Sequence, residues 1–251
     1  MTESSLLIDM GNTRIKWVWA RDGQINEESH GSGEPEDFRN FVKSQAAGPP
    51  GRVLLSSVAA VDRSAAIIDV CASHWGVAVS RVLSSPKQAG IINAYDRPET
   101  LGVDRWLAIV GAAHTYGTPV IIWDLGTATT LDAVDKEGQH QGGLILPGPV
   151  TMLKSLKSET MLSVPGGLDD TDENAVHPGQ TTSQCIAQGV RAAQLGALHQ
   201  FLENTSGRAG QSQTRRPQLI VTGGAAEGIL SALDMEYVFD PWLVFRGMLT
   251  C

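Results

Sequence analysis

The feature that most constrains the fold is an apolar run that ends in an aspartate and a glycine-containing turn, because it occurs twice. The first copy is Leu6-Leu7-Ile8-Asp9-Met10-Gly11-Asn12-Thr13, and the second is Ile121-Ile122-Trp123-Asp124-Leu125-Gly126-Thr127-Ala128-Thr129. The same offset aligns Asp22-Gly23 with Glu137-Gly138. Each copy predicts a strand, a tight turn, another strand and a second turn. The chain is therefore expected to contain two related halves.

The two aspartates are candidates for phosphate and cation chemistry. A strand that ends in a carboxylate and then turns on small residues presents an oxygen ligand for a cation, with backbone N–H groups facing the same space. A single Asp-x-Gly is also the ordinary sequence of a hairpin turn. The repetition of both the acid and the glycine favours two half-domains that clasp the phosphate tail of a nucleotide between them.

Composition limits the class of partner. The chain has 251 residues, of which 42% are hydrophobic, so it can form one large domain or two small ones. Its formal charge of −8 gives no basic surface for nucleic acid or for an anionic membrane, and a small molecule is the expected partner. No apolar stretch is long enough to cross a bilayer, and the three cysteines lack metal-type spacing. A cytoplasmic protein is expected.

The periodicity of apolar residues predicts alternating strands and helices. Strands are expected at Arg52–Ser57 and Val77–Leu83, with a helix over Asp62–Trp75 between them. Further helices are expected at Leu101–Tyr116 and from about Thr182 to Asn204. This order is typical of a mixed sheet flanked by helices.

A second acidic residue stands beside a basic one where a helix begins, in Gly102-Val103-Asp104-Arg105. The carboxylate can accept a proton from an alcohol, and the guanidinium can hold a carboxylate by two-point contact. An acid in a first helical turn also complements the helix dipole without any catalytic role. Both interpretations of Asp104 are open at this point.

Glycine-rich turns supply weaker signals. Thr222-Gly223-Gly224 lies between an expected strand and an expected helix over Ala225–Leu233, and bare backbone there leaves room for a flat ring or a phosphate. Gly142-Gly143 and Pro147-Gly148 either shape a pocket wall or only punctuate a hairpin. Thr182 is a helix N-cap by position, although its hydroxyl can equally face a cleft.

In their order and spacing, these motifs, together with Gly179-x-x-Thr182, resemble type III pantothenate kinase from about residue 6 to residue 248. That family belongs to the acetate and sugar kinase, Hsp70 and actin superfamily. The resemblance implies an α/β fold of two ribonuclease-H-like (actin-like ATPase) half-domains, each a mixed sheet flanked by helices, with an interdomain cleft. Residues 1–117 would form the N-terminal domain and residues 118–251 the C-terminal domain.

The resemblance also implies an activity. The family phosphorylates pantothenate to 4′-phosphopantothenate with ATP, which is the first step of coenzyme A biosynthesis. Mg²⁺ would accompany ATP, and a monovalent cation, K⁺ or NH₄⁺, would be required. A homodimer is expected, with neither a nucleic acid nor a membrane as partner.

Carried over residue by residue, the resemblance makes Asp104 the general base and Asp124 the ligand of the monovalent cation. ATP would contact Thr127 and the first phosphate loop, which comprises Asp9, Met10, Gly11, Asn12, Thr13, Arg14, Ile15 and Lys16, with Asp9 near the metal. Pantothenate would contact Tyr95, Gly102, Val103, Asp104, Arg105 and Thr182.

Two residues depart from the family pattern, and two other functions compete. Asp96 stands where the family often has Asn, and Arg246 where an acidic residue is common, which affects only loop shape and helix packing. A nucleotide-binding regulator without catalysis is one rival, and a sugar kinase of the same fold is the other. The base Asp104 favours an enzyme, and the cation Arg105 favours a substrate with a carboxylate.

Overall fold

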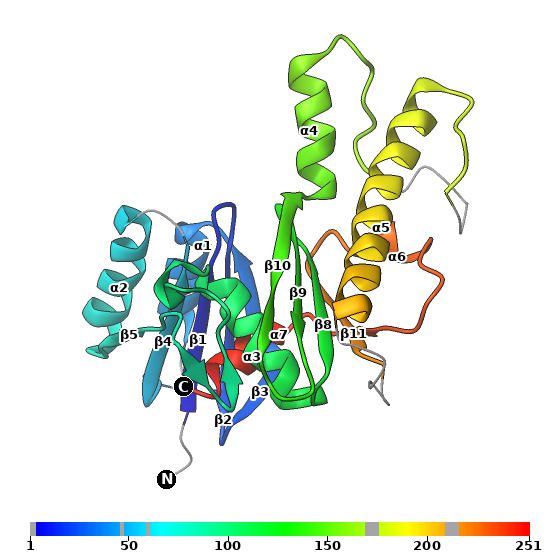
Figure 1. Ribbon diagram of the computed structural model, residues 1–251. Coiled ribbons are helices and arrows are strands. Elements are labelled where there is room, and N and C mark those ends of the chain that lie inside the picture. The colour runs from blue at the N-terminus through cyan, green and yellow to red at the C-terminus, as the bar shows by residue number, and fades with distance from the viewer. Residues whose placement is uncertain (1–3, 46–47, 59–60, 169–175, 209–215) are drawn as a thin grey trace. The chain divides into compact units, whose positions relative to one another are not determined.

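The computed structural model describes residues 4–45, 48–58, 61–168, 176–208 and 216–251. Its internal contacts divide the chain into two compact units, Met1–Thr115 with Trp242–Cys251, and Tyr116–Pro241. The elements of both units are labelled in Figure 1. Among the described residues, no helix combines the length and the apolar character needed to cross a membrane.

The first unit is built on a five-stranded sheet of order β3-β2-β1-β4-β5. Its strands are β1 Ser4–Met10, β2 Ile15–Arg21, β3 Gln24–Gly33, β4 Arg52–Ser57 and β5 Val79–Arg81. Strand β1 pairs antiparallel with β2 and parallel with β4, so the sheet is mixed. The helices are α1 Pro35–Ser44, α2 Val61–Trp75, α3 Val103–Tyr116 and α7 Leu243–Met248, and the segment before α3 contains β6 Lys87–Gln88, β7 Ile91–Ile92 and the 3₁₀ turn η1 Pro98–Thr100.

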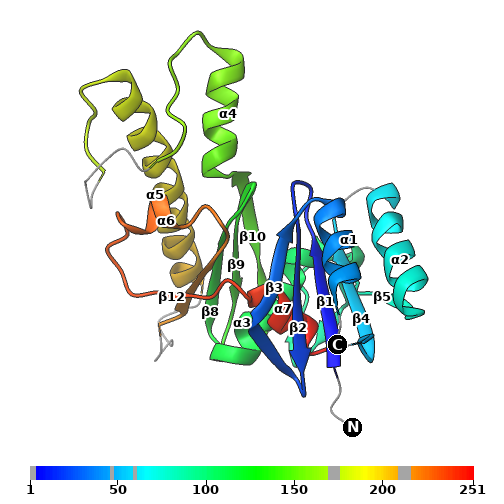
Figure 2. The ribbon, with the colours of Figure 1, turned by 180° about the vertical axis from the view of Figure 1, so that it is seen from behind.

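Helices cover both faces of this sheet, and successive side chains of β1 point to opposite faces. Leu6 and Ile8 pack with Phe38 of α1 and Ile67 of α2. On the other face, Leu7 lies in one cluster with residues of α3 and α7. Figure 2 shows α1 and α2 side by side, in agreement with their mutual contacts. The first unit is thus a helix–sheet–helix sandwich.

The C-terminal helix α7 belongs to the first unit because two glycines let it approach α3 closely. A Cβ atom on Gly111 would lie 2.2 Å from the carbonyl oxygen of Leu243, and one on Gly247 would lie 2.1 Å from that of Leu107. Side chains at either glycine would hold the two backbones apart. The sequence places this segment in the second half, within 118–251, whereas its contacts are with the first.

The second unit repeats the topology of the first, with strand order β10-β9-β8-β11-β12. Its strands are β8 Val120–Leu125, β9 Ala128–Val134, β10 His140–Pro147, β11 Gln218–Thr222 and β12 Val238–Phe239, and its helices are α4 Pro149–Glu159, α5 Thr182–Arg208 and α6 Glu227–Leu230. Strand β8 pairs antiparallel with β9 and parallel with β11, as β1 does with β2 and β4. The prediction of two mixed sheets flanked by helices is confirmed.

Two predicted elements are shorter than expected. The helix expected over Ala225–Leu233 is reduced to α6. Before it, the N–H of Ala225 donates to the carbonyl of Leu125 at 2.9 Å, and after it the N–H groups of Ala232 and Leu233 donate to carbonyls three residues earlier, as in a turn. The strand expected over Val77–Leu83 is reduced to β5, which lies at the sheet edge and pairs only with residues Val53 to Leu55 of β4.

Candidate active site

The first acidic strand tip, Asp9, is positioned by the pairing of β1 with both neighbours. Lys16 of β2 lies opposite Asp9, and Ser56 of β4 lies beside it. The Ser56 hydroxyl donates to Asp9 Oδ1 at 3.2 Å. The turn that follows is closed by the N–H of Gly11, which donates to the carbonyl of Arg14 at 3.1 Å. The residues between them are exposed, as a phosphate-binding loop requires.

The carboxylate of Asp9 is buried and has a second carboxylate nearby, so its charged form would be stabilised by a bound cation. Burial raises the pKa of Asp9 from 3.8 to about 6, the nearby Lys16 opposes this rise, and the negative charge of Asp104 adds to it. Asp104 therefore lies close enough in the same unit for the two carboxylates to repel each other. A cation at Asp9 would remove both penalties, so this site fits the metal that accompanies ATP.

The raised pKa of Asp9 predicts a pH-dependent stability. Between about pH 4 and about pH 6 the folded chain binds a proton on Asp9 that the unfolded chain has released, so the free energy of unfolding falls as pH rises through this range, on the order of 2 kcal/mol for this group. Urea unfolding of the wild type and Asp9→Asn across pH 4 to 7, without added metal or nucleotide, measures the effect. The stability advantage of Asp9→Asn should grow up to about pH 6. An advantage that does not change with pH would contradict the assignment.

Arg63, at the start of α2, is a contact of the first loop that sequence reasoning missed. Its guanidinium donates to the carbonyl of Asn12 at 2.5 Å and lies 3.5 Å from a carboxylate oxygen of Glu34. Glu34 is the N-cap of α1. Arg63 thereby connects the loop with the beginnings of two helices. No spacing in the sequence relates these three residues.

The general-base candidate Asp104 lies in the first turn of α3. Its Oδ1 accepts the N–H of Arg105 at 2.8 Å. A Cβ atom on Gly102 would lie 2.7 Å from the same oxygen, so a side chain at this position would require the Asp104 carboxylate to move. Helix-dipole complementarity explains an acid at this position, but it does not explain why the acid also lies near Asp9.

The guanidinium of Arg105 lies against Tyr95 in the first unit. Arg105 is 7% exposed, its Nη1 donates to the Tyr95 hydroxyl at 3.0 Å, and its Cζ lies 5.9 Å from the centroid of the Tyr95 ring. The buried Asn93 shapes this loop, because its Oδ1 accepts the N–H of Tyr95 and its Nδ2 donates to the carbonyl of Ser85. Sequence reasoning did not identify Asn93, since the loop has no periodicity that marks a buried amide.

In the second unit, the tip residue Asp124 is packed against the Gly-Gly turn. Thr222 of β11 is its partner in the parallel ladder. Gly223 has φ +99°, and a Cβ atom there would lie 2.6 Å from Asp124 Oδ1, whereas nothing lies within 4 Å of one built on Gly224. The space expected beside this turn is therefore at Gly224. An aspartate carboxylate beside a glycine turn offers an oxygen ligand to a cation, and the described residues contain no cluster of three His, Cys, Asp or Glu side chains.

The remaining predicted residues of the second unit, Thr127 and Thr182, are both exposed. The prediction that Thr182 is the N-cap of α5 is wrong by one residue. Thr181 is the cap, because its carbonyl accepts the N–H of Cys185 at 2.8 Å and its hydroxyl accepts the N–H of Gln184 at 3.3 Å. The hydroxyl of Thr182 is thus not used for capping.

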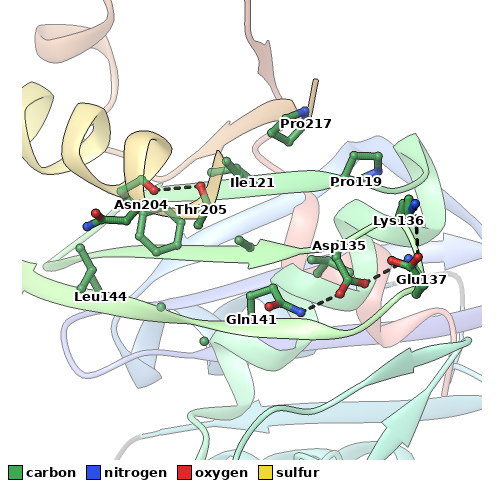
Figure 3. A pocket seen from close by; sticks show the side chains of 15 residues that line it. Pro119, Ile121, Asp135, Lys136, Glu137, Gln141, Leu144, Asn204, Thr205 and Pro217 are labelled. Atoms are coloured by element: carbon green, nitrogen blue, oxygen red, sulfur yellow. Dashed lines mark hydrogen bonds and ion pairs between the residues drawn. The ribbon is translucent and has the colours of Figure 1, made fainter. Parts of the chain in front are cut away.

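A cavity of about 500 Å³ lies in the second unit (Figure 3). Its lining includes Ile121, Leu144 and Phe201, with Asp135 and Gln141 at the polar side. Asp135 is occupied by the hairpin, since it accepts the backbone N–H groups of Glu137 and Gln139. The cavity contains none of the residues predicted to bind ATP or pantothenate.

The two units share one sheet topology, and each has a carboxylate at the tip of its central strand. In the first unit, the carboxylate of Asp104 and the guanidinium of Arg105 belong to adjacent residues near that tip. This arrangement is typical of a nucleotide-dependent phosphotransferase. A model of the type III pantothenate kinase family matches residues 5–204. The chain belongs to the type III pantothenate kinase family.

Individual relatives agree with this family. The type III pantothenate kinase of Methylibium petroleiphilum is 35% identical over 98% of this chain and 96% of its own length, and that of Polaromonas sp. is 32% identical over 97% and 95%. Among solved structures, a Baf family transcriptional activator from Campylobacter jejuni has a TM-score of 0.57 at 17% identity, over 97% of this chain and 94% of its own. The ethanolamine utilization protein EutJ from Carboxydothermus hydrogenoformans has 0.53 at 12% identity, over 98% and 89%. These two structures share the fold.

Proposed function

We propose that this chain transfers the γ-phosphoryl group of ATP to the primary hydroxyl of pantothenate and forms 4′-phosphopantothenate, the first step of coenzyme A biosynthesis. The observation that carries the proposal is the grouping of Asp104 and Arg105 with Asp9 in a chain that belongs to this family. A regulator has no need of a base beside an anion clamp. A sugar has no carboxylate for Arg105 to hold.

In the proposed reaction, the carboxylate of Asp104 accepts the proton of the pantothenate hydroxyl while the hydroxyl oxygen bonds to the γ-phosphorus and the bond to the ADP oxygen breaks. Arg105 and Tyr95 hold the pantothenate carboxylate, together with Gly102 and Val103. Phosphoryl transfer depends chiefly on positioning and on charge neutralisation, so these side chains act by orienting the acceptor.

Two cations complete the proposed site. Asp9, within the loop from Asp9 to Lys16, would hold the Mg²⁺ that accompanies ATP, and this ion would neutralise phosphate charge. Asp124 would hold K⁺ or NH₄⁺, and Thr127 would contact ATP. The raised pKa of Asp9 and the glycine surroundings of Asp124 support this division.

We further propose that the enzyme is a cytoplasmic homodimer. Edge strand β10 carries exposed apolar side chains, with Leu144 43% and Ile145 64% exposed. Exposed apolar residues on a sheet edge favour contact with a second chain. Thr182 is also proposed to contact pantothenate.

A coupled assay of ADP release, with Mg²⁺ and K⁺ present, tests the function. Pantothenate should support turnover that sugars do not, and phosphorus NMR should identify 4′-phosphopantothenate as the product. Turnover with a sugar alone would favour the sugar kinase. Nucleotide binding without turnover of any acceptor would favour the regulator.

A further inference from the structure

The loop that contains Thr127 is hydrogen-bonded to Gly148, which joins β10 to α4, and to Thr151 near the start of α4. The carbonyl of Thr127 accepts the N–H of Gly148 at 3.0 Å and the hydroxyl of Thr151 at 2.5 Å. A Cβ atom on Gly148 would lie 2.1 Å from the carbonyl oxygen of Gly126, so the two backbones are in direct contact. The position of Thr127 thus depends on where the end of β10 is held.

One side chain from the long helix α5 fixes that end. Gln194 is fully buried; its Nε2 donates to the carbonyl of Pro147 at 2.9 Å, and its Oε1 accepts the hydroxyl of Thr129 at 2.7 Å. Pro147 is the last residue of β10, and Thr129 is the second residue of β9. A single amide therefore bridges the start of β9 and the end of β10, and both of these strand ends lie next to residues 126–128.

The surroundings of Gln194 make the amide a specific choice. The core of the second unit around α5 is apolar and includes Leu153, Val190 and Leu198. A buried amide in such a core is tolerated only when both of its ends are hydrogen-bonded, as they are here. Methionine would occupy a similar volume and need no partners, so the distinctive contribution of Gln194 is the bridge itself.

We propose that Gln194 is a positioning residue for the nucleotide: through Thr129 and Pro147 it holds the loop of residues 126–128 in the shape that receives the phosphates of ATP. This inference rests on the proposed function, in which Thr127 contacts ATP. The inference also gives Thr127 and Thr129 different roles. The hydroxyl of Thr129 is buried and donates to Gln194, whereas Thr127 is exposed.

The test compares Gln194→Met, Thr129→Val and Thr129→Ser with a packing control, Leu198→Ala, in the same helix. In Gln194→Met and Thr129→Val we expect the KM for ATP to rise about tenfold, because each change removes at least one buried hydrogen bond of the bridge, with the KM for pantothenate nearly unchanged. Thr129→Ser keeps the hydroxyl, so its KM for ATP should equal that of the wild type. The double variant Thr129→Val/Gln194→Met should be no worse than either single variant, because both remove one bridge.

Hydrogen–deuterium exchange of the nucleotide-free proteins gives a readout that does not depend on activity. Amides of residues 126–128 should exchange faster in Gln194→Met and Thr129→Val than in Leu198→Ala, which is destabilised by a cavity alone. With an active wild type, an unchanged KM for ATP or unchanged exchange in both bridge variants would overturn the inference. A wild type that does not bind ATP would overturn the proposed function and this inference with it.

Discussion

Asp104→Asn should fold and bind ATP but lose turnover with pantothenate by ~10²–10⁴-fold, the usual contribution of a general base. The amide has the shape of the carboxylate, and its Oδ1 can still accept the N–H of Arg105, so α3 should begin as it does now. What the variant cannot do is take the proton of the attacking hydroxyl. Steady-state ADP release and calorimetric titration of ATP separate these two properties.

Asp96→Asn is the matched control for this variant. Asp96 is an exposed acid in the loop before α3, and its conversion to Asn should leave turnover unchanged. Asp104→Asn also removes the negative charge that raises the pKa of Asp9, so the pKa of Asp9 should fall. Near wild-type turnover in Asp104→Asn would remove this residue from the mechanism.

Arg105→Lys should raise the KM for pantothenate by ~10–100-fold and leave the KM for ATP within about twofold, because lysine keeps the charge but cannot make the planar two-point contact. The buried guanidinium is already oriented by Tyr95. A flexible ammonium group would lose that orientation.

Two comparisons isolate the carboxylate clamp. Arg97→Lys, at an exposed position paired with Glu99 in the same loop, should change neither KM. Pantothenyl alcohol lacks the substrate carboxylate, so its KM should respond much less to Arg105→Lys than that of pantothenate does. An equal increase for both acceptors would mean that Arg105 supports the loop and does not bind the carboxylate.

The parts of the fold that could be predicted from sequence are those set by local pattern. The turn after Asp9 and the turn after Asp124 follow directly from alternating apolar residues and an Asp-x-Gly, and each lies where its strand ends. The repeat of this pattern was enough to predict two related halves, and these halves share one sheet topology. The membership of α7 was not predictable in this way, because it depends on the contact between Gly111 and Gly247, which are far apart in sequence.

The supporting polar residues were missed for a related reason. Arg63, Asn93 and Gln194 each donate to backbone carbonyls that only the folded chain brings near them. The N-cap of α5 was misplaced because Thr181 and Thr182 are chemically equivalent caps, and only the geometry of the Gln184 N–H selects Thr181. Candidate ligand-binding residues could therefore be named from sequence motifs, whereas the residues that support their positions could not.

The central claim is that each acidic strand tip, Asp9 in the first unit and Asp124 in the second, supports the binding of ATP through a cation. Calorimetric titration of ATP into the wild type, Asp9→Asn and Asp124→Asn, with Mg²⁺ and K⁺ and again without them, tests it most directly. With the cations, each variant should bind ATP ~10–100-fold more weakly, as for loss of a contact to a charged group. Without them, each variant should bind at least as well as the wild type, because a carboxylate repels phosphate. Wild-type affinity in either variant with both cations present would contradict the claim.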